Sequence, residues 1–327
     1  MSEKILELQN VDIRYVTKDL GTCYAVNDVS LSLEKGHTLG LVGETGAGKT
    51  TIAKGILRIL PQPQGHVTGG KVIFEGEDLY QKSNSAMREI RGHKISMIFQ
   101  DPMSALNPID TVGDQIAEVI RLHKHISRKE AFAQAIDMLE LVNIPGERAT
   151  EYPHQFSGGM KQRVIIAMAL ACAPELLIAD EPTTALDVTI QAQVLDMMND
   201  LKEKMGTSMI LITHDLGVVA EMCDEVAVIY AGEIVEIGTA RDIFKNMSHP
   251  YTIGLFESLP DLKSNSKRLK LIPGLMPDPT DLPQGCKFAP RCAHCTEACT
   301  KGPVALTEQS AGHFCRCLFP QKREVNA

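Results

Sequence analysis

Apolar and polar residues form two kinds of pattern along this chain. Apolar residues alternate with polar ones over residues 4–16 and 25–36, as in strands with one buried face. Short apolar runs bounded by turn residues predict further strands over residues 37–43, 71–80, 94–102, 175–180, 208–215 and 225–238. Between about residues 112 and 172 the pattern is helical, and Ser127 with Glu130 fits a capping box that opens a helix.

This order of elements predicts an α/β fold. Strands that alternate with helices and carry motifs in their turns indicate a mostly parallel sheet, with a helical insertion over about residues 101–172. After residue 248 proline and glycine become frequent, which predicts irregular structure. We therefore expect one large domain over residues 1–247 and a small irregular extension over residues 248–327.

Composition and charge narrow the class of protein. The 327 residues are 44% hydrophobic and 23% charged, as in ordinary globular proteins, and the formal net charge is −8. Without a Lys/Arg block, the chain is not expected to bind nucleic acid mainly by electrostatics. No run approaches 18 consecutive apolar residues, and the first residues lack a signal-peptide pattern, so we expect a cytoplasmic protein.

The motif GETGAGKT, residues 43–50, lies between a predicted strand and a predicted helix. It matches G-x-x-x-x-G-K-[ST], in which backbone N–H groups and a helix N-terminus surround phosphate oxygens. Lys49 would reach the β- and γ-phosphates, and Thr50 would hold Mg²⁺. The nucleotide-binding residues expected here are Gly43, Glu44, Thr45, Gly46, Ala47, Gly48, Lys49, Thr50 and Thr51.

Two acidic residues, Asp180 and Glu181, follow one another at the end of the apolar run LLIADE. Asp180 stands where a carboxylate in the outer coordination of Mg²⁺ is needed, and Glu181 could take a proton from the attacking water. Together with the phosphate loop, the pair indicates hydrolysis of a nucleoside triphosphate rather than a solvated strand end.

Between these two motifs lies FSGGMKQR, residues 156–163, which resembles the LSGGQ signature of ABC ATPases with Phe for Leu and Met for Gln. Other positions resemble the family's Q-loop, D-loop and switch histidine: Gln100, Asp187 in the Ala-Leu-Asp of residues 185–187, and His214. Tyr15 looks like the aromatic residue that stacks on adenine, with Tyr24 as the alternative. The resemblance implies a P-loop NTPase with a RecA-like core, an antiparallel β subdomain and a helical subdomain.

In that family two cassettes pack head to tail, and each ATP lies between the phosphate loop of one cassette and the Ser-Gly-Gly turn of the other. The resemblance therefore implies that Ser157, Gly158 and Gly159 bind the partner cassette's ATP, and that Asp187 lies at the dimer seam. The implied catalytic residues are Glu181, His214 and Gln100, and Gln100 would also bind Mg²⁺ beside Thr50.

Longer segments resemble the ATP-binding subunits of dipeptide and oligopeptide importers, over about residues 1–320 and with the D-type subunit as the best fit. These segments are PTTALDVTIQAQVLDMMNDLK, FQDPMSALNP and SHPYTIGL. The resemblance implies a peripheral ATPase on the cytoplasmic face of the membrane. Its partners would be an F-type ATPase subunit, two transmembrane permeases and, indirectly, an extracytoplasmic substrate-binding protein. Nickel or short sugars are alternative cargoes, and a soluble ABC ATPase acting on nucleic acid is the alternative of another class.

Six of the nine cysteines lie between residues 286 and 317. Their spacing suits a metal site but does not decide between zinc and iron–sulfur, and thiols without a metal are a third interpretation. The extension also carries GC-x-F-x-x-RC, which includes Arg291 and belongs to the peptide-importer resemblance. That resemblance implies a 4Fe-4S cluster, with Zn²⁺ as the alternative, that folds a tail with little apolar core; the ligands would be Cys286, Cys292, Cys299 and Cys317.

Overall fold

The computed structural model describes residues 3–19, 21–101, 105–184, 186–258 and 271–321. The chain divides into two compact units. Unit 1 consists of Met1–Ile5, Leu33–Thr38 and Gln81–Thr213, and unit 2 consists of Leu6–Ser32, Leu39–Tyr80 and His214–Ala327. No helix within the described ranges is both long enough and apolar enough to cross a membrane.

In unit 1 three strands pair in parallel: β6 (Ile95–Ile98), β7 (Leu176–Asp180) and β8 (Ser208–Ile212). β7 is the middle strand, since Ile178 pairs with Met97 of β6 and with Ile210 of β8. Every residue of β7 and β8 is buried. A strand covered on both faces needs no polar positions, which explains the continuous apolar runs in the sequence.

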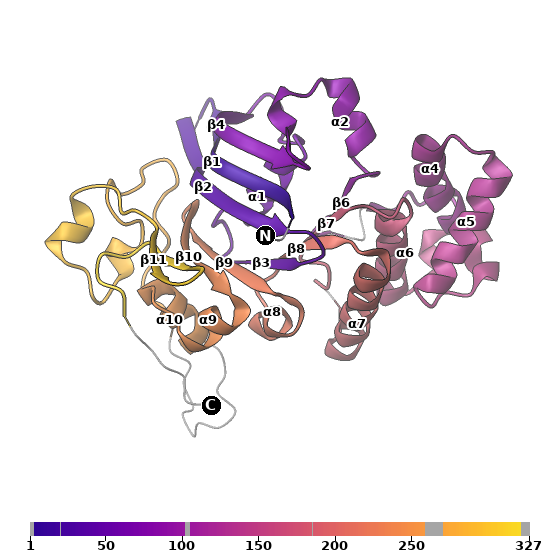
Figure 1. The fold of residues 1–327 in the computed structure, drawn as a ribbon. Helices are drawn as coiled ribbons and strands as arrows, with labels where there is room; N and C mark the ends of the chain where they lie inside the picture. The colour runs from indigo at the N-terminus through magenta and orange to yellow at the C-terminus, as the bar shows by residue number, and fades with distance from the viewer. Residues whose placement is uncertain (1–2, 20, 102–104, 185, 259–270, 322–327) are drawn as a thin grey trace. The chain divides into compact units, whose positions relative to one another are not determined.

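The helices of unit 1 are α2 (Asn84–Ile90), α4 (Val112–Lys124), α5 (Arg128–Leu141), α6 (Gly158–Leu170) and α7 (Val188–Met205). Figure 1 shows α4, α5 and α6 as neighbours, and each of the three contacts the other two. The predicted capping box is confirmed at α5, because Ser127 Oγ accepts the Glu130 N–H and the Glu130 carboxylate accepts the Ser127 N–H. Two 3₁₀ turns, Gly146–Thr150 and Pro153–Gln155, lead into α6.

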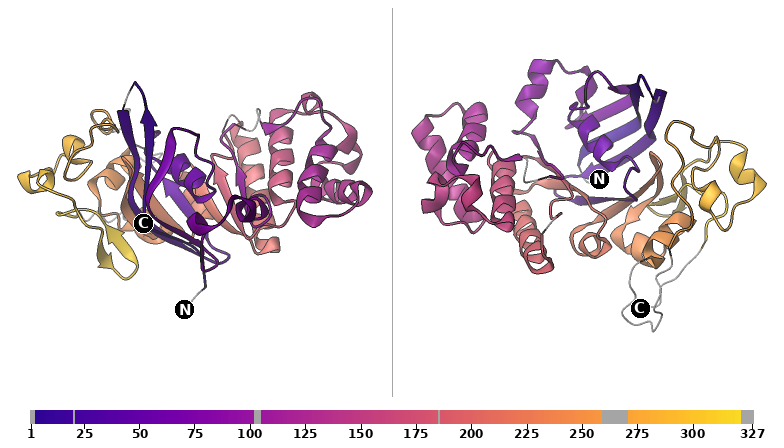
Figure 2. Two further views of the ribbon diagram at one scale, coloured as in Figure 1. Left: turned by 90° about the horizontal axis from the view of Figure 1, so that it is seen from above. Right: turned by 180° about the vertical axis from the view of Figure 1, so that it is seen from behind.

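Unit 2 holds most of a four-stranded sheet with the order β2-β1-β4-β5. Its strands are drawn in indigo to purple in Figure 2. Its strands are β1 (Lys4–Thr17), β2 (Gly21–Glu34), β4 (Gly65–Phe74) and β5 (Glu77–Asp78). β4 pairs antiparallel with both β1 and β5. Along β2 the buried Val29 and Leu31 alternate with more exposed residues, so the predicted period of two is confirmed.

A second set of strands in unit 2 carries the phosphate loop and the extension. In spatial order these strands are β3 (Thr38–Val42), β9 (Glu225–Tyr230), β10 (Glu233–Thr239), β12 (His313–Cys315) and β11 (Thr307–Ser310). β3 and β9 are parallel, whereas the other neighbours are antiparallel. The helices of this unit are α1 (Lys49–Ile56), α8 (Leu216–Met222), α9 (Ala240–Lys245) and α10 (Pro250–Glu257).

The extension has an apolar core and regular pieces, so the expectation of a wholly irregular tail is corrected. β12 joins the sheet beside β10, with Cys315 opposite Glu236, and short 3₁₀ turns cover Ala289–Arg291 and Glu297–Thr300. The rings of Tyr230, Tyr251 and Phe288 pack with centroids 4.6, 5.2 and 5.4 Å apart. An aromatic cluster of this kind contributes apolar packing to the segment.

Glu236 on β10 is a buried anchor for this part of the chain. Its carboxylate has no exposed surface, and it accepts hydrogen bonds from the Ser248 N–H at 2.6 Å, the His249 N–H at 2.9 Å and His313 Nε2 at 2.8 Å. Burial lowers the pKa of His249 to about 4, so this imidazole is neutral and its Nδ1 accepts the Tyr251 N–H at the start of α10. The β10 carboxylate therefore ties α10 and β12 to the sheet.

Candidate functional site

The phosphate loop, residues 43–50, connects β3 to α1 in unit 2. Gly48 is the N-cap of α1 with a φ of +107°, and a Cβ there would lie 2.5 Å from the Ala25 carbonyl oxygen. A Cβ at Gly43 would lie 2.2 Å from the Ile229 carbonyl oxygen. Both positions require glycine, because any side chain would collide with backbone. The turn therefore presents its N–H groups and the α1 N-terminus to an anion.

Lys49, the first residue of α1, is 7% exposed and leans back over the loop. Its Nζ donates to the carbonyl oxygens of Gly43 at 2.7 Å and Glu44 at 3.0 Å. The Glu44 carbonyl also accepts the Ala47 N–H at 3.1 Å, which closes the turn. These contacts hold the ammonium group at the loop, which reduces the ordering cost of binding an anion.

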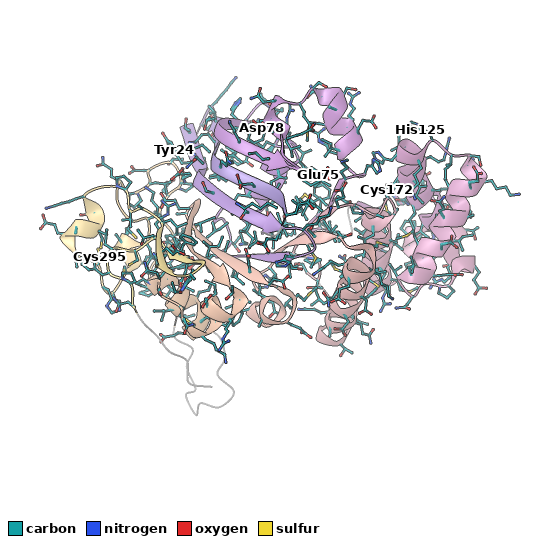
Figure 3. All side chains as sticks on the ribbon, in the orientation of Figure 1. Tyr24, Glu75, Asp78, His125, Cys172 and Cys295 are labelled. Carbon is teal, nitrogen blue, oxygen red and sulfur yellow. The ribbon has the colours of Figure 1, made fainter. Side chains whose placement is uncertain are left out.

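The two candidate adenine-stacking residues lie on neighbouring strands of unit 2. The Tyr15 hydroxyl, on β1, donates to Thr51 Oγ1 of α1 at 3.4 Å, so this residue reaches the helix that follows the loop. Tyr24, on β2 and labelled in Figure 3, is 40% exposed. The Arg14 guanidinium lies 4.7 Å from the centroid of its ring. Tyr15 therefore contacts the nucleotide-binding segment directly. The ring of Tyr24 instead packs against the Arg14 guanidinium in a cation–π contact.

His214 begins the later part of unit 2 and is exposed. The next residue, Asp215, caps α8: its Oδ1 accepts the Gly217 N–H at 2.9 Å and the Val218 N–H at 3.3 Å. Because this cap directly follows His214, it fixes the backbone between His214 and α8.

In unit 1, Asp180 and Glu181 stand at the carboxyl end of β7. Asp180 is 1% exposed. Glu181 has a φ of +49°, unusual for a residue with a side chain, and its N–H donates to the Ile212 carbonyl at 2.8 Å. Glu181 Oε2 accepts from Gln100 Nε2 at 3.1 Å and from Thr184 Oγ1 at 3.0 Å. The structure thus brings together Gln100 and Glu181 and orients the carboxylate of Glu181.

Thr184 was missed by the sequence analysis. A threonine three residues after an acidic residue is common in turns, and nothing in the sequence marks its hydroxyl as a partner of Glu181. The spacing in DEPTT is compatible with a turn that folds back, and the structure realises it with the Thr184 N–H bonded to the Glu181 carbonyl at 3.2 Å.

The Ser-Gly-Gly turn lies at the N-terminus of α6 in unit 1. Ser157 is the N-cap, and its Oγ accepts the Met160 N–H at 3.4 Å. Ser157 and Gly158 are exposed, whereas the preceding Phe156 is buried with the Arg148 guanidinium 4.4 Å from its ring centroid. The buried ring fixes the turn while the N-terminus of a 13-residue helix faces outward, an arrangement suited to an anion held by another molecule.

The D-loop prediction falls partly outside the described residues, since Ala185 is not among them. Asp187 is described: it is exposed and is the N-cap of α7, with its Oδ1 accepting the Ile190 N–H at 3.0 Å. Its contacts within this chain are those of a helix cap. A role at a dimer seam stays a prediction.

The prediction of a 4Fe-4S cluster in a metal-binding extension is contradicted by the structure. The four predicted ligands line one cavity of about 20 Å³ with apolar neighbours such as Phe288 and Val304; these ligands are Cys286, Cys292, Cys299 and Cys317. Yet among the described residues no group of three or more His, Cys, Asp or Glu side chains is arranged to hold a metal ion. The iron–sulfur assignment is therefore corrected, and the Zn²⁺ alternative has no support either.

The physical reasons for this correction are space and protonation. A cavity of about 20 Å³ has room for about one water molecule, not for a cube of iron and sulfur atoms. Burial raises the pKa of Cys286 to about 11 and also raises the pKa values of Cys292 and Cys317, so these groups are thiols at neutral pH. Metal ligation requires thiolates, and burial disfavours them at these three cysteines, whereas hydrogen bonding to the Thr296 backbone lowers the pKa of Cys299.

Comparison with known proteins shows the family of this chain. Residues 26–184 match the model of the ABC transporter family, and residues 235–299 match that of the oligopeptide/dipeptide transporter C-terminal region. The chain is 50% identical to the dipeptide transport ATP-binding protein DppD of Bacillus subtilis, over 99% of this chain and 97% of that one. It is 49% identical to the oligopeptide transport ATP-binding protein OppD of Haemophilus influenzae, over 98% of both chains.

A solved structure agrees with these sequence relatives. The ATP-binding cassette MJ0796, in a dimeric post-hydrolysis state bound to ADP and Pi, matches with a TM-score of 0.65 at 26% identity, over 72% of this chain and 99% of that one. The ABC ATPase fold, with its P-loop and mixed α/β sheets, is thereby confirmed. The chain belongs to the ABC transporter family, among the dipeptide and oligopeptide transport ATP-binding proteins, and is an ATPase of that family.

Proposed function

We propose that this protein is the D-type ATP-hydrolysing subunit that powers import of dipeptides or oligopeptides. One observation carries the proposal: near full-length identity of about one half with DppD and OppD, through the extension as well as the cassette. The extension matters because a cassette motif alone indicates ATP hydrolysis and says nothing about cargo. We take residues 1–247 as the nucleotide-binding domain and residues 248–327 as the extension specific to this group.

The phosphate loop binds the triphosphate of ATP in this proposal. Lys49 contacts the β- and γ-phosphates, and its two carbonyl contacts already hold it at the loop. Thr50 and Gln100 supply a hydroxyl and an amide oxygen, donors that suit Mg²⁺, and the bound ion would neutralise charge on the phosphates. Because the Gln100 amide nitrogen donates to Glu181, the amide oxygen is the atom that serves the ion. Tyr15 stacks on adenine.

Glu181 acts as the general base toward the attacking water. The hydrogen bonds from Gln100 and Thr184 both reach its Oε2, which orients the carboxylate for its role as proton acceptor. Asp180 supports Mg²⁺ from its outer shell, and His214 contacts the γ-phosphate and positions the water. Roles of this kind require defined side-chain orientation, which the Glu181 contacts provide.

The exposed Ser-Gly-Gly turn acts on the ATP of a second cassette. Ser157, Gly158 and Gly159 open α6 outward, so a head-to-tail partner could place its γ-phosphate at this helix N-terminus. We propose an F-type ATPase as that partner, with Asp187 at the seam. The other partners are the two membrane permeases and, indirectly, an extracytoplasmic substrate-binding protein. The assembly would hold this subunit at the cytoplasmic face of the membrane.

The proposal is tested by uptake. The complete importer is produced in a host that lacks its own peptide importers, with either this chain or its Lys49→Ala variant, and entry of a radiolabelled dipeptide and a radiolabelled tetrapeptide is measured. We expect ATP-dependent uptake with the natural chain and background uptake with the variant. Uptake of labelled nickel or a short sugar in place of both peptides would refute peptide import while leaving ATP-driven transport intact.

A further inference from the structure

Three side chains of the extension contact the phosphate loop, all within unit 2. The Arg291 guanidinium forms an ion pair with the Glu44 carboxylate, with Nη1 2.9 Å from Oε2. The Tyr251 hydroxyl accepts the Glu44 backbone N–H at 2.9 Å. The Met276 methyl lies 3.2 Å from the position a Cβ would take at Gly46. The extension thus touches the loop through a charge, a hydroxyl and a methyl group.

Arg291 is held firmly in place. Its side chain is 6% exposed, its Nε donates to the Pro273 carbonyl at 2.9 Å and its Nη2 donates to the Ile272 carbonyl at 3.4 Å. Its Nη1 also lies 3.3 Å from the Tyr230 hydroxyl, and the guanidinium carbon lies 5.8 and 6.0 Å from the ring centroids of Tyr230 and Phe288. Arginine stays charged in proteins, so a permanent positive charge is fixed beside the loop.

Glu44 places a negative charge inside a loop that binds a polyanion. Its backbone carbonyl accepts from Lys49 Nζ, the group expected to contact phosphate, and its side chain is 29% exposed. An uncompensated carboxylate here would repel the triphosphate through a medium less polar than water. Arg291 Nη1 lies 3.2 and 2.9 Å from the two carboxylate oxygens, which offsets this charge and fixes its direction.

We propose that Arg291 is a positioning residue for ATP binding, which acts through Glu44. It neutralises the Glu44 carboxylate and holds residue 44, and thereby links the folded extension to the affinity of the phosphate loop for ATP. This rests on the proposed function, because it concerns the ATP site of the same ATPase. It assigns a role to the arginine of the GC-x-F-x-x-RC motif, which the sequence analysis left without one.

The test measures the affinity of the purified full-length chain for Mg·ATP and Mg·ADP by calorimetry. Arg291→Ala should weaken ATP binding about tenfold and ADP binding less, because ATP carries more negative charge. The loss should shrink at high salt, because the Glu44 carboxylate is 29% exposed and its repulsion of the triphosphate is screened by ions. Arg291→Lys keeps the charge but loses the contacts of Nε and Nη2, so its loss of ATP affinity should be smaller than that of Arg291→Ala.

The decisive comparison uses Glu44→Gln. Alone, this variant should bind ATP several-fold more tightly than the natural chain, since Arg291 is then an uncompensated cation near phosphate. In the double variant Glu44→Gln with Arg291→Ala, affinity should return to within about threefold of the natural chain, a coupling that a merely structural role does not produce. Should Arg291→Ala fail to fold, unchanged or weaker ATP binding by Glu44→Gln alone would still overturn the proposal.

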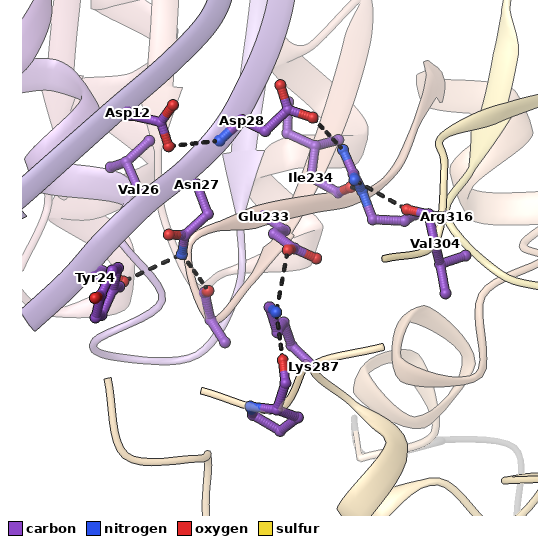
Figure 4. Close-up of polar contacts among 12 residues, drawn as sticks. Asp12, Tyr24, Val26, Asn27, Asp28, Glu233, Ile234, Lys287, Val304 and Arg316 are labelled. Atoms are coloured by element: carbon purple, nitrogen blue, oxygen red, sulfur yellow. Dashed lines mark hydrogen bonds and ion pairs between the residues drawn. The ribbon is translucent and has the colours of Figure 1, made fainter. Parts of the chain in front are cut away.

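Arg316 provides the matched control (Figure 4). It belongs to the same extension, is 12% exposed, donates to the carbonyls of Ile234 at 2.9 Å and Val304 at 3.0 Å, and lies 4.0 Å from Asp28. Arg316→Ala should change ATP affinity less than twofold. An equal loss of ATP affinity in both arginine variants, or no loss in Arg291→Ala, would refute the role of Arg291 and leave the proposed function untouched. A natural chain that bound no ATP would refute the proposed function as well.

Discussion

The phosphate loop, residues 43–50, and the cysteine-rich segment, residues 285–317, each contain a close backbone approach that requires glycine. A Cβ would lie 2.2 Å from the Ile229 carbonyl oxygen at Gly43 and 2.1 Å from the Cys299 carbonyl oxygen at Gly285. Both segments carried a sequence motif that predicted a ligand. The ATP prediction agrees with the family and the fold, whereas the iron–sulfur prediction is contradicted.

The difference lies in which atoms bind the ligand. A phosphate loop binds through backbone N–H groups, and their directions follow from a short local pattern of glycines and a helix start. A 4Fe-4S cluster needs four cysteine sulfur atoms in a defined arrangement, and these must be thiolates. That arrangement depends on how Phe288 and its aromatic neighbours fill the extension, which spacing along the chain does not report.

The largest effect should follow from Lys49→Ala in the phosphate loop. Loss of the ammonium group removes charge stabilisation of the phosphates, so ATP turnover by the assembled importer should fall at least about hundredfold. Cys295→Ser, at an exposed position of the cysteine-rich segment (Figure 3), should leave turnover within about twofold. Phosphate release by importers that carry either variant measures this turnover. A comparable loss of turnover in Cys295→Ser would contradict the difference between the two regions.

Glu236→Ala should cause the largest loss of stability in the extension. The change leaves His313 and two backbone N–H groups without their buried acceptor, which costs about 3–5 kcal/mol of the free energy of unfolding. Glu221→Ala, at an exposed position of α8, should stay within about 0.5 kcal/mol. Denaturant unfolding of both variants provides the measurement, and equal midpoints would show that Glu236 is not an anchor.

A smaller loss is expected for Gly285→Ala. The added Cβ would meet the Cys299 carbonyl oxygen at 2.1 Å, and relieving that overlap should cost about 1–3 kcal/mol. The control is Gly302→Ala, where the added Cβ meets no described atom within 4 Å. Thermal unfolding should show a lower midpoint for the first variant and little change for the second; the reverse order would contradict the packing described for the extension.

The smallest effect should come from metal removal. Because the aromatic cluster and Glu236 hold the extension, an anaerobically purified chain treated with an iron and zinc chelator should keep its unfolding midpoint within about 2 °C. Elemental analysis of the untreated chain accompanies the melt. Stoichiometric iron, together with a large fall of the unfolding midpoint on chelation, would show that the cysteine-rich segment does bind a metal cluster. Both regions would then bind the ligand that their motifs predicted.

Particular elements show where sequence reasoning reached its limit. The buried strand β7 and its terminal acids were predictable, because an apolar run that ends in two carboxylates indicates both the strand and its polar end. The Thr184 hydroxyl on Glu181 was not, since it depends on the exact path of a turn with an unusual φ. The capping box of α5 was predictable from four residues, because both of its hydrogen bonds are local.

By itself, the sequence determined the phosphate loop, the acids after β7, the Ser-Gly-Gly helix start and the membership of the family. Each of these depends on residues close together in the chain, where backbone geometry follows from local residue types. Only the tertiary structure decided that the extension has an aromatic core and that Arg291 pairs with Glu44 across 247 residues. It also decided that the cysteines lack a metal-binding arrangement among the residues described for this segment. Contacts between distant segments are selected by the packing of the whole chain, and no local pattern encodes them.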